Sequence, residues 1–358
     1  MKILVLGTGM QGKAALHDLA NSPDVEHVIA ADADVDSLNR FVNRLNTSKI
    51  ETIGLEASNH TLLSKLLSRV EAAVVLLPNR FNLPIARLAV EHAVHVVNSS
   101  YTPPGMEDLD PLAGALGVAI LPEFGFDPGI DLVLAGQAVR DLDEVHLFNS
   151  YGTGFPEPAI AARNPLHYMI SWSFDGVLKA YLRDARLVRD GEVMVIPGRE
   201  IFAPQNVHTI ELKDWGLMEA YPNGDVVRFL DQLSIRGTVK EAGRYAMRYP
   251  GHSVFWYVLA QMGFLDDEAL QVAEVQISPR NFVRSLLEPQ LQYAEDERDV
   301  AVLRIDVEGL KDSLPQRISY QVSDVRDLNT GLMAMNRTVG YTASIGAQMI
   351  LRGDISRR

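Results

Sequence analysis

Short apolar runs alternate with longer amphipathic segments along the first third of the chain. The runs are rich in Val, Ile and Leu and too short for helices, which predicts buried parallel strands. They lie at Ile3–Leu6, Val28–Ala31, Ile50–Leu55, Ala72–Leu77, His95–Asn98 and Val118–Leu121. The segments between them, of about 10 to 15 residues, have the apolar spacing of helices. This alternation predicts an α/β fold with a doubly wound parallel sheet of the Rossmann type.

The pattern changes after Gly129. Ile130–Val139 has helical spacing, and beyond it many apolar residues recur at every second position. This alternation is typical of antiparallel strands with one covered face. It is found at Glu144–Asn149, Glu192–Ile196, Val226–Leu230, Ala273–Ile277 and Ala301–Val307. We therefore expect a second, α+β domain over residues 132–328 with a mainly antiparallel sheet, followed by a helical tail at Ala343–Leu351.

Composition narrows the range of functions. The 358 residues include no cysteine, which excludes disulfides, thiolate metal sites and a cysteine nucleophile. The formal net charge of −13 does not suit binding to nucleic-acid phosphates. No apolar run approaches the roughly 20 residues of a membrane helix, and Met1–Leu6 is too short for a signal-peptide core. We expect a soluble, cytoplasmic protein that acts on small molecules and binds neither nucleic acid nor membrane.

A phosphate-binding motif follows the first predicted strand. Gly7, Gly9 and Gly12 form G-x-G-x-x-G, with Met10 and Gln11 between the last two glycines, and a helical segment follows. In dinucleotide-binding domains the first glycine permits a tight turn, the second lets the backbone approach a pyrophosphate, and the third allows close helix packing. The N-terminus of the following helix offers unpaired N–H groups and the positive end of its dipole. This motif predicts dinucleotide binding.

The end of the second predicted strand indicates which dinucleotide binds. Asp32 lies twenty residues after Gly12, where an acidic side chain would hold the ribose 2′-hydroxyl. A carboxylate there would repel a 2′-phosphate, so we expect NAD rather than NADP. Arg40 and Arg44 follow in the next helical segment and keep NADP as the alternative.

Ligands bind at the carboxyl ends of strands in an open parallel sheet. Pro78 and Asn79 follow the fourth predicted strand, and Ser99 and Ser100 follow the fifth, so we expect these four residues to contact the cofactor. Tyr101 comes next in the sequence. The sixth strand leads into residues 123–129, Glu-Phe-Gly-Phe-Asp-Pro-Gly, in which Asp127 is either a site residue or the N-cap of the next helix.

Several of these motifs resemble the saccharopine dehydrogenase family of the glutamate-forming, reductase type. The similar segments are residues 98–103, 123–131, 150–158, 164–166, 171–173 and 248–252. The family pattern has a histidine where this sequence has Leu132. The length of the sequence, the Arg-Tyr-Pro-Gly-His block at 248–252 and the tail at 338–342 more closely resemble L-lysine 6-dehydrogenases of the same superfamily.

The resemblance implies hydride transfer between a nicotinamide and the carbon of a C–N bond in a small amino acid, without a metal. It also implies a Rossmann domain over residues 1–131 that is completed by 329–358. Residues 132–328 would bind substrate and join two copies into a homodimer.

That reaction makes definite chemical demands. The amine must lose a proton before hydride leaves its carbon, which requires a base. A substrate carboxylate is best bound by the two-pronged guanidinium of arginine, and an ammonium by an acid. We therefore expect Tyr101, Asp127 and His252 to be catalytic and four residues to bind substrate: Glu123, Arg163, Arg244 and Arg248. The alternatives are that Arg248 forms a structural ion pair and that His252 is simply packed in the core.

Three functions remain open. The first is oxidative deamination of a side-chain amine, as in lysine 6-dehydrogenases. The second is reductive condensation of an aldehyde with an amino acid, which needs a second cationic clamp such as Arg163. The third is a non-catalytic NAD-binding scaffold or sensor, which would need the glycine loop but no polar pocket.

Overall fold

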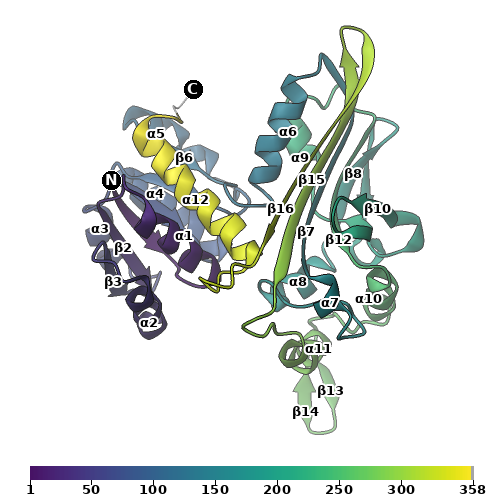
Figure 1. The fold of residues 1–358 in the computed structure, drawn as a ribbon, viewed down its shortest axis with the longest axis horizontal. Coiled ribbons are helices and arrows are strands. Elements are labelled where there is room, and N and C mark those ends of the chain that lie inside the picture. Colours follow the sequence, from purple (N-terminus) through teal and green to yellow (C-terminus); the bar gives the residue numbers. More distant parts are fainter. Residues whose placement is uncertain (356–358) are drawn as a thin grey trace. The chain divides into compact units, whose positions relative to one another are not determined.

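The computed structural model describes residues 1–355, which divide into two compact units (Figure 1). The first unit contains Met1–Ile130 and the C-terminal segment that starts at Asn336. The second unit contains Asp131–Met335. No helix within residues 1–355 combines the length and apolar character needed to cross a membrane.

A six-stranded parallel sheet forms the centre of the first unit, as the sequence pattern predicted. Its strand order is β3-β2-β1-β4-β5-β6, which is the doubly wound arrangement. The strands are β1 (Lys2–Leu6), β2 (His27–Asp32), β3 (Ile50–Gly54), β4 (Ala72–Val75), β5 (His95–Asn98) and β6 (Ile120–Leu121). The inner residues of β1, β2 and β4 are fully buried, so they exclude water on both faces of the sheet.

Helices cover both faces of this sheet (Figure 1). They are α1 (Met10–Asn21), α2 (Val35–Leu45), α3 (His60–Leu67), α4 (Asn82–Glu91), α5 (Asp110–Ala115) and the C-terminal α12 (Ala334–Arg352), with short 3₁₀ turns η1 (Asn79–Phe81) and η2 (Glu107–Leu109). Asp34 and Asn59 cap α2 and α3 through their side-chain oxygens.

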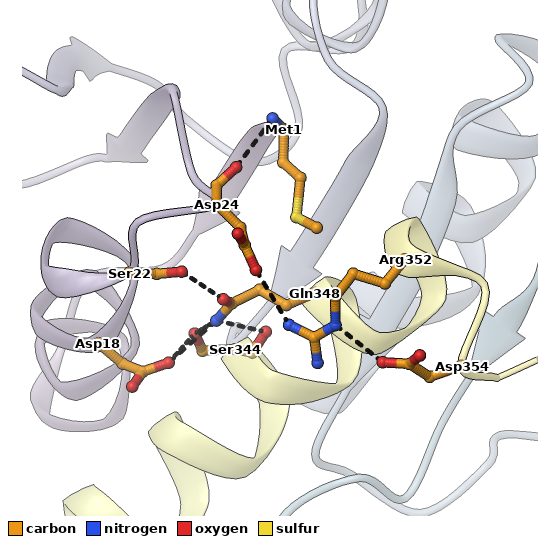
Figure 2. Close-up of polar contacts among 8 residues, drawn as sticks. All are labelled: Met1, Asp18, Ser22, Asp24, Ser344, Gln348, Arg352 and Asp354. Carbon is orange, nitrogen blue, oxygen red and sulfur yellow. Dashed lines mark hydrogen bonds and ion pairs between the residues drawn. The ribbon is translucent and has the colours of Figure 1, made fainter.

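The C-terminal helix packs on α1 through a buried polar network (Figure 2). Ser344 Oγ and Gln348 Nε2 donate to the carboxylate of Asp18 at 2.6 and 3.1 Å, and Ser22 Oγ donates to Gln348 Oε1 at 2.6 Å. Because Ser344 and Gln348 are buried, breaking this network would leave polar groups without partners. The part of α12 around Ser344 and Gln348 is therefore an integral part of the first unit.

An eight-stranded mixed sheet forms the second unit, with the main order β10-β11-β12-β7-β15-β16. All its pairings are antiparallel except β12 with β7, which agrees with the predicted mainly antiparallel sheet. The strands are β7 (Glu144–Pro156), β8 (Ala185–Arg189), β9 (Glu192–Ile196), β10 (His208–Leu212), β11 (Gly216–Pro222), β12 (Glu241–Arg248), β15 (Asp299–Lys311) and β16 (Leu314–Val325), and a separate hairpin contains β13 (Leu270–Val272) and β14 (Val275–Ile277).

One predicted strand of the second unit is a helix. Residues 226–230 form the N-cap and the start of α9 (Val227–Gln232). Val226, Val227, Phe229 and Leu230 are all buried, and their spacing i, i+1, i+3, i+4 matches one helical face. The other helices are α6 (Ile130–Arg140), α7 (Pro158–Ala161), α8 (Phe174–Ala180), α10 (His252–Gln261) and α11 (Pro279–Leu287), with 3₁₀ turns η3 (Gly198–Glu200), η4 (Pro204–Asn206) and η5 (Glu288–Gln290).

The carboxylate of Asp299, at the start of β15, binds two backbone amides at the end of the second unit. It accepts hydrogen bonds from the backbone N–H groups of Ala334 at 2.7 Å and Met335 at 3.2 Å. Asp299 is fully buried, and burial raises its pKa from 3.8 to about 6 despite these bonds. The protonated Asp299 carboxyl therefore stabilises the fold at pH values below the pKa that it has in the unfolded protein. This stabilisation is lost as the pH rises through the pKa of about 6 that it has in the folded protein.

We predict that Asp299→Asn removes this pH dependence. Between about pH 4 and pH 7 the unfolding free energy of the wild type should fall relative to the variant by up to about 3 kcal/mol, since a pKa unit corresponds to about 1.4 kcal/mol. Urea unfolding of both proteins at the two pH values measures the difference. If the unfolding free energy of the wild type minus that of the variant stays constant, or increases with pH, the pKa assigned to Asp299 is wrong.

Candidate functional site

The glycine loop has the geometry of a pyrophosphate cradle. Gly7 has a φ of +84°, and a Cβ there would lie 2.6 Å from the carbonyl oxygen of Leu76. A Cβ at Gly12 would lie 2.0 Å from the carbonyl oxygen of Gly7. A Cβ at Gly9 would meet no atom within 4 Å. Gly7 and Gly12 are thus required by close backbone contacts, whereas Gly9 faces open space.

The first turn of α1 is left open to an anion. Gly9 is its N-cap, where a side-chain hydrogen bond to the turn is absent. Met10 and Gln11 lie in this first turn, where backbone N–H groups have no acceptor within the helix. Unpaired N–H groups and the helix dipole together favour a phosphate. The residues of this loop therefore fit the pyrophosphate of a dinucleotide.

Asp32 is engaged by the same loop. One carboxylate oxygen accepts from the N–H of Thr8 at 2.5 Å and its Oγ1 at 3.1 Å, and the other accepts from the N–H of Asp34 at 3.0 Å. Partial burial opposes the charged form, but these bonds outweigh it and lower the pKa of Asp32. In the helix that follows, Ser37 Oγ lies 3.4 Å from the ammonium of Lys13.

Polar side chains at the ends of β4 and β5 form a second group. Asn98 is fully buried, and its Oδ1 accepts from the N–H of Ser100 at 3.1 Å and from Asn82 Nδ2 at 3.4 Å. Asn82 also donates to Asn79 Oδ1 at 3.0 Å. Pro78 begins the short turn that contains Asn79. The sequence-based prediction missed Asn82 and Asn98, although an asparagine at the end of an apolar strand is the kind of signal that marks such a site.

The loop after β6 is tied to the loop after β5. Glu123 is buried, and its Oε1 accepts from the N–H and the Oγ1 of Thr102, each at 2.9 Å. The N–H of Glu123 donates to the carbonyl of Ser100 at 3.1 Å. A Cβ at Gly125 would lie 2.8 Å from Cβ of Ser99, so the two loops pack without a gap. Tyr101 and Asp127 are half-buried in these loops.

In the second unit, Arg248 ends β12 in a nearly closed interior. It is 7% exposed, and its Nη1 donates to Thr153 Oγ1 at 2.8 Å and to the carbonyl of Met247 at 2.7 Å. Its guanidinium also lies over the ring of Tyr168. Within residues 1–355, no carboxylate pairs with Arg248 and its Nε has no hydrogen-bond partner. The hydroxyls of Tyr168 and Tyr293 likewise lack partners there.

His252 begins α10 inside an aromatic cluster. Its Nε2 lies 2.9 Å from the hydroxyl of Tyr181, and its ring stacks on Tyr221 with an interplanar angle of 11°. Burial, reinforced by the positive charge of Arg248, lowers the pKa of His252 well below 6.5. The imidazole is therefore neutral at physiological pH.

The other two candidate arginines are already paired. Arg244 and Asp131 form a fully buried ion pair at 2.9 Å, and the guanidinium of Arg244 also lies over the ring of Phe229. Arg163 pairs with Glu297, and its own side chain is 64% exposed. Their guanidinium groups are thus engaged by carboxylates of the protein itself, unlike that of Arg248.

Both parts of the sequence match models of one protein family. Residues 3–121 match the saccharopine dehydrogenase NADP binding domain, and residues 125–358 match the saccharopine dehydrogenase C-terminal domain. The chain belongs to the saccharopine dehydrogenase family.

Individual saccharopine dehydrogenase relatives match nearly the whole sequence. It is 26% identical over 420 residues to saccharopine dehydrogenase (NADP(+), L-glutamate-forming) of Saccharomyces cerevisiae, with 99% of this protein and 91% of the relative covered. It is 25% identical to alpha-aminoadipic semialdehyde synthase of Arabidopsis thaliana, with 93% of this protein but only 38% of that relative covered. The structure of apo saccharopine dehydrogenase (L-Glu forming) from S. cerevisiae has the same fold, with a TM-score of 0.87, 24% identity and coverage of 99% and 92%.

The expected preference for NAD was wrong, because this saccharopine dehydrogenase family member matches an NADP binding domain over residues 3–121. An NAD preference would need the Asp32 carboxylate to be available to accept a hydrogen bond from the ribose 2′-hydroxyl. In the structure, Thr8 and Asp34 donate to both of its oxygens. The spacing of residues along the sequence also could not predict the position of Lys13. Its ammonium lies 3.4 Å from Oγ of Ser37, a residue of the helix α2 that follows Asp32.

We predict opposite defects for two glycine variants. Gly9→Val should fold with a free energy of unfolding within about 1 kcal/mol of the wild type, since its side chain enters open space. It should weaken NADPH binding at least about 100-fold by filling the pyrophosphate position. Gly12→Val is the matched control and should be strongly destabilised by its contact with the Gly7 carbonyl.

NADPH titration followed by fluorescence, together with urea unfolding, measures both properties. A folded Gly9→Val protein that binds NADPH normally would exclude this loop as the cofactor site.

Proposed function

We propose that this protein is an NADP-dependent oxidoreductase that acts on the C–N bond of an amino acid. The family match and the fit of the glycine loop support a dinucleotide enzyme. The observation that carries the substrate assignment is the buried Arg248, which has no carboxylate partner among the described residues.

The cofactor would be held by the first unit. Gly7, Gly9 and Gly12, with the N–H groups of Met10 and Gln11, would bind the pyrophosphate. Lys13 and Ser37 would donate hydrogen bonds to a 2′-phosphate. Pro78, Asn79, Ser99 and Ser100 would line the cofactor at the strand ends. When bound, the nicotinamide supplies the chemistry of hydride transfer.

Arg248 would bind a substrate carboxylate. A buried guanidinium without a counter-charge costs several kcal/mol, so a structural role alone would favour a carboxylate of the protein beside it. Instead, neutral groups surround Arg248, and the unpartnered hydroxyls of Tyr168 and Tyr293 add further donors near it. This arrangement suits an incoming carboxylate, which accepts hydrogen bonds and supplies the missing charge.

Tyr101 and Asp127 would move the amine proton. Both lie in the loops that follow β5 and β6, where ligands of parallel sheets bind. His252 cannot act as a cationic acid, because its imidazole is neutral and bonded to Tyr181. We assign His252 to the environment of Arg248, because its buried ring is packed on Tyr221 and its Nε2 is bonded to Tyr181.

For the specific reaction we propose oxidative deamination of a side-chain amine, as in lysine 6-dehydrogenases. A free amino acid has one carboxylate next to its α-carbon and needs one arginine clamp. Of the three arginines that the sequence suggested, only Arg248 is not engaged by a carboxylate of the protein. Oxidation of the amine-bearing carbon gives an imine, and water then releases ammonia and leaves an aldehyde.

A saccharopine dehydrogenase reaction is the second candidate, because relatives that match nearly the whole sequence have that name. In that case, oxidation of the secondary amine of saccharopine and hydrolysis of the imine would release glutamate. This substrate has more carboxylates than lysine and would need cationic groups in addition to Arg248.

A substrate panel distinguishes the two reactions. Purified enzyme with NADP and either L-lysine or saccharopine is followed by the absorbance of NADPH, and the products are assayed for ammonia and glutamate. We expect turnover of lysine with release of ammonia. Release of glutamate from saccharopine would establish the second candidate, and no turnover of any amino acid would refute the proposed function.

We predict that Arg248→Lys raises the KM for the amino acid about 10- to 150-fold, because one charge-assisted hydrogen bond is worth roughly 1.5–3 kcal/mol. The Kd of NADPH should change little, since the residue lies in the second unit. Arg186→Lys, at a half-exposed pair with Asp225, is the control and should leave the KM unchanged. An Arg248→Lys protein with normal KM but reduced stability would make Arg248 a structural residue.

A further inference from the structure

Glu123 occupies a backbone conformation that glutamate rarely adopts. Its φ is +59°, in the left-handed region that favours glycine, and it lies directly after the short strand β6 and Pro122. Its side chain is nonetheless buried, with 5% of the residue exposed. A strained conformation that is kept by a large side chain points to a role for that side chain.

The bonds of Glu123 bracket Tyr101. Its N–H donates to the carbonyl of Ser100, on one side of Tyr101. Its Oε1 accepts from both the N–H and the Oγ1 of Thr102, on the other side. One residue thus fixes the backbone immediately before and after the tyrosine. The loop is also anchored at its base, where the N–H of Phe124 donates to the carbonyl of Asn98 at 2.9 Å.

We propose that Glu123 is a positioning residue that holds Tyr101 in place through Thr102. This inference rests on the proposed function, in which Tyr101 handles the amine proton. It also replaces the expectation that Glu123 binds the substrate ammonium, because the carboxylate oxygen Oε1 already accepts two hydrogen bonds from Thr102. Displacement of a reacting group by about 1 Å can reduce a rate about 100-fold, so such a residue affects kcat more than KM.

Two variants separate positioning from substrate binding. Glu123→Gln keeps a side-chain oxygen that can accept from Thr102 but removes the charge. Glu123→Leu has a similar size and removes both the acceptor and the charge. Glu91→Leu, at an exposed carboxylate of the first unit, is the control and should retain wild-type kinetics.

We expect Glu123→Leu to lower kcat about 10- to 100-fold with little change in either KM. Glu123→Gln should stay within about threefold of the wild type, because the hydrogen bonds are retained. In a Tyr101→Phe background, Glu123→Leu should have almost no further effect, since the two residues act as a unit. A rise in substrate KM in Glu123→Gln, or full additivity with Tyr101→Phe, would overturn the proposal.

Hydrogen–deuterium exchange provides a readout that is independent of activity. Amides in a peptide spanning residues 99–106 should exchange faster in Glu123→Leu than in the wild type and Glu123→Gln. Unchanged exchange in Glu123→Leu would refute the role of Glu123 even if the enzyme is active. If the wild type turns over no amino acid, the proposed function fails, while exchange still reports whether Glu123 holds this loop.

Discussion

The first turn of helix α1 lies between two stretches of backbone that approach too closely for a side chain. On one side of the turn, a Cβ at Gly12 would lie 2.0 Å from the carbonyl oxygen of Gly7. On the other side, a Cβ at Gly340, in the C-terminal helix, would lie 2.3 Å from the carbonyl oxygen of Gln11. The glycine loop and the C-terminal helix are therefore fixed against the same turn. Hydrogen bonds from Ser344 and Gln348 to Asp18 hold the two helices together further along (Figure 2). The surroundings of the glycine loop thus include residues more than 300 positions away in the sequence.

Two buried arginines of one strand in the second unit have different surroundings. Arg244 and Arg248 both belong to β12, and both are at least nine-tenths buried. Asp131 neutralises Arg244 at 2.9 Å, whereas Arg248 is surrounded by neutral hydroxyls, a carbonyl and aromatic rings. An interior charge without a counter-charge is costly, so in the proposed function a substrate carboxylate would supply the charge that the described residues do not place beside Arg248. The same positive charge also helps to keep His252 neutral.

The apolar pattern was sufficient to predict the parallel sheet, because strands buried on both faces are uniformly apolar over four or more residues. It failed at residues 226–230, where a short buried run fits a strand and a helix equally well. The glycine loop was predictable because its motif, three glycines at fixed spacing between a strand and a helix, lies within six consecutive residues. The surroundings of Asp32, Arg163 and Arg244 were not, since Thr8, Glu297 and Asp131 reach them only through the tertiary fold. Conformational features such as the positive φ of Glu123 also leave no trace in composition or spacing.

In the proposed reaction, hydride moves between the nicotinamide and the nitrogen-bearing carbon of an amino acid. The most direct test uses lysine that carries two deuterium atoms at its side-chain nitrogen-bearing carbon, or saccharopine that carries them at the corresponding carbon of its lysine portion. After turnover with NADP, the reduced cofactor is analysed by mass spectrometry. We expect the reduced cofactor formed from one of these substrates to carry one deuterium. Reduced cofactor without deuterium, with the label found in water or retained in the product, would contradict the claim.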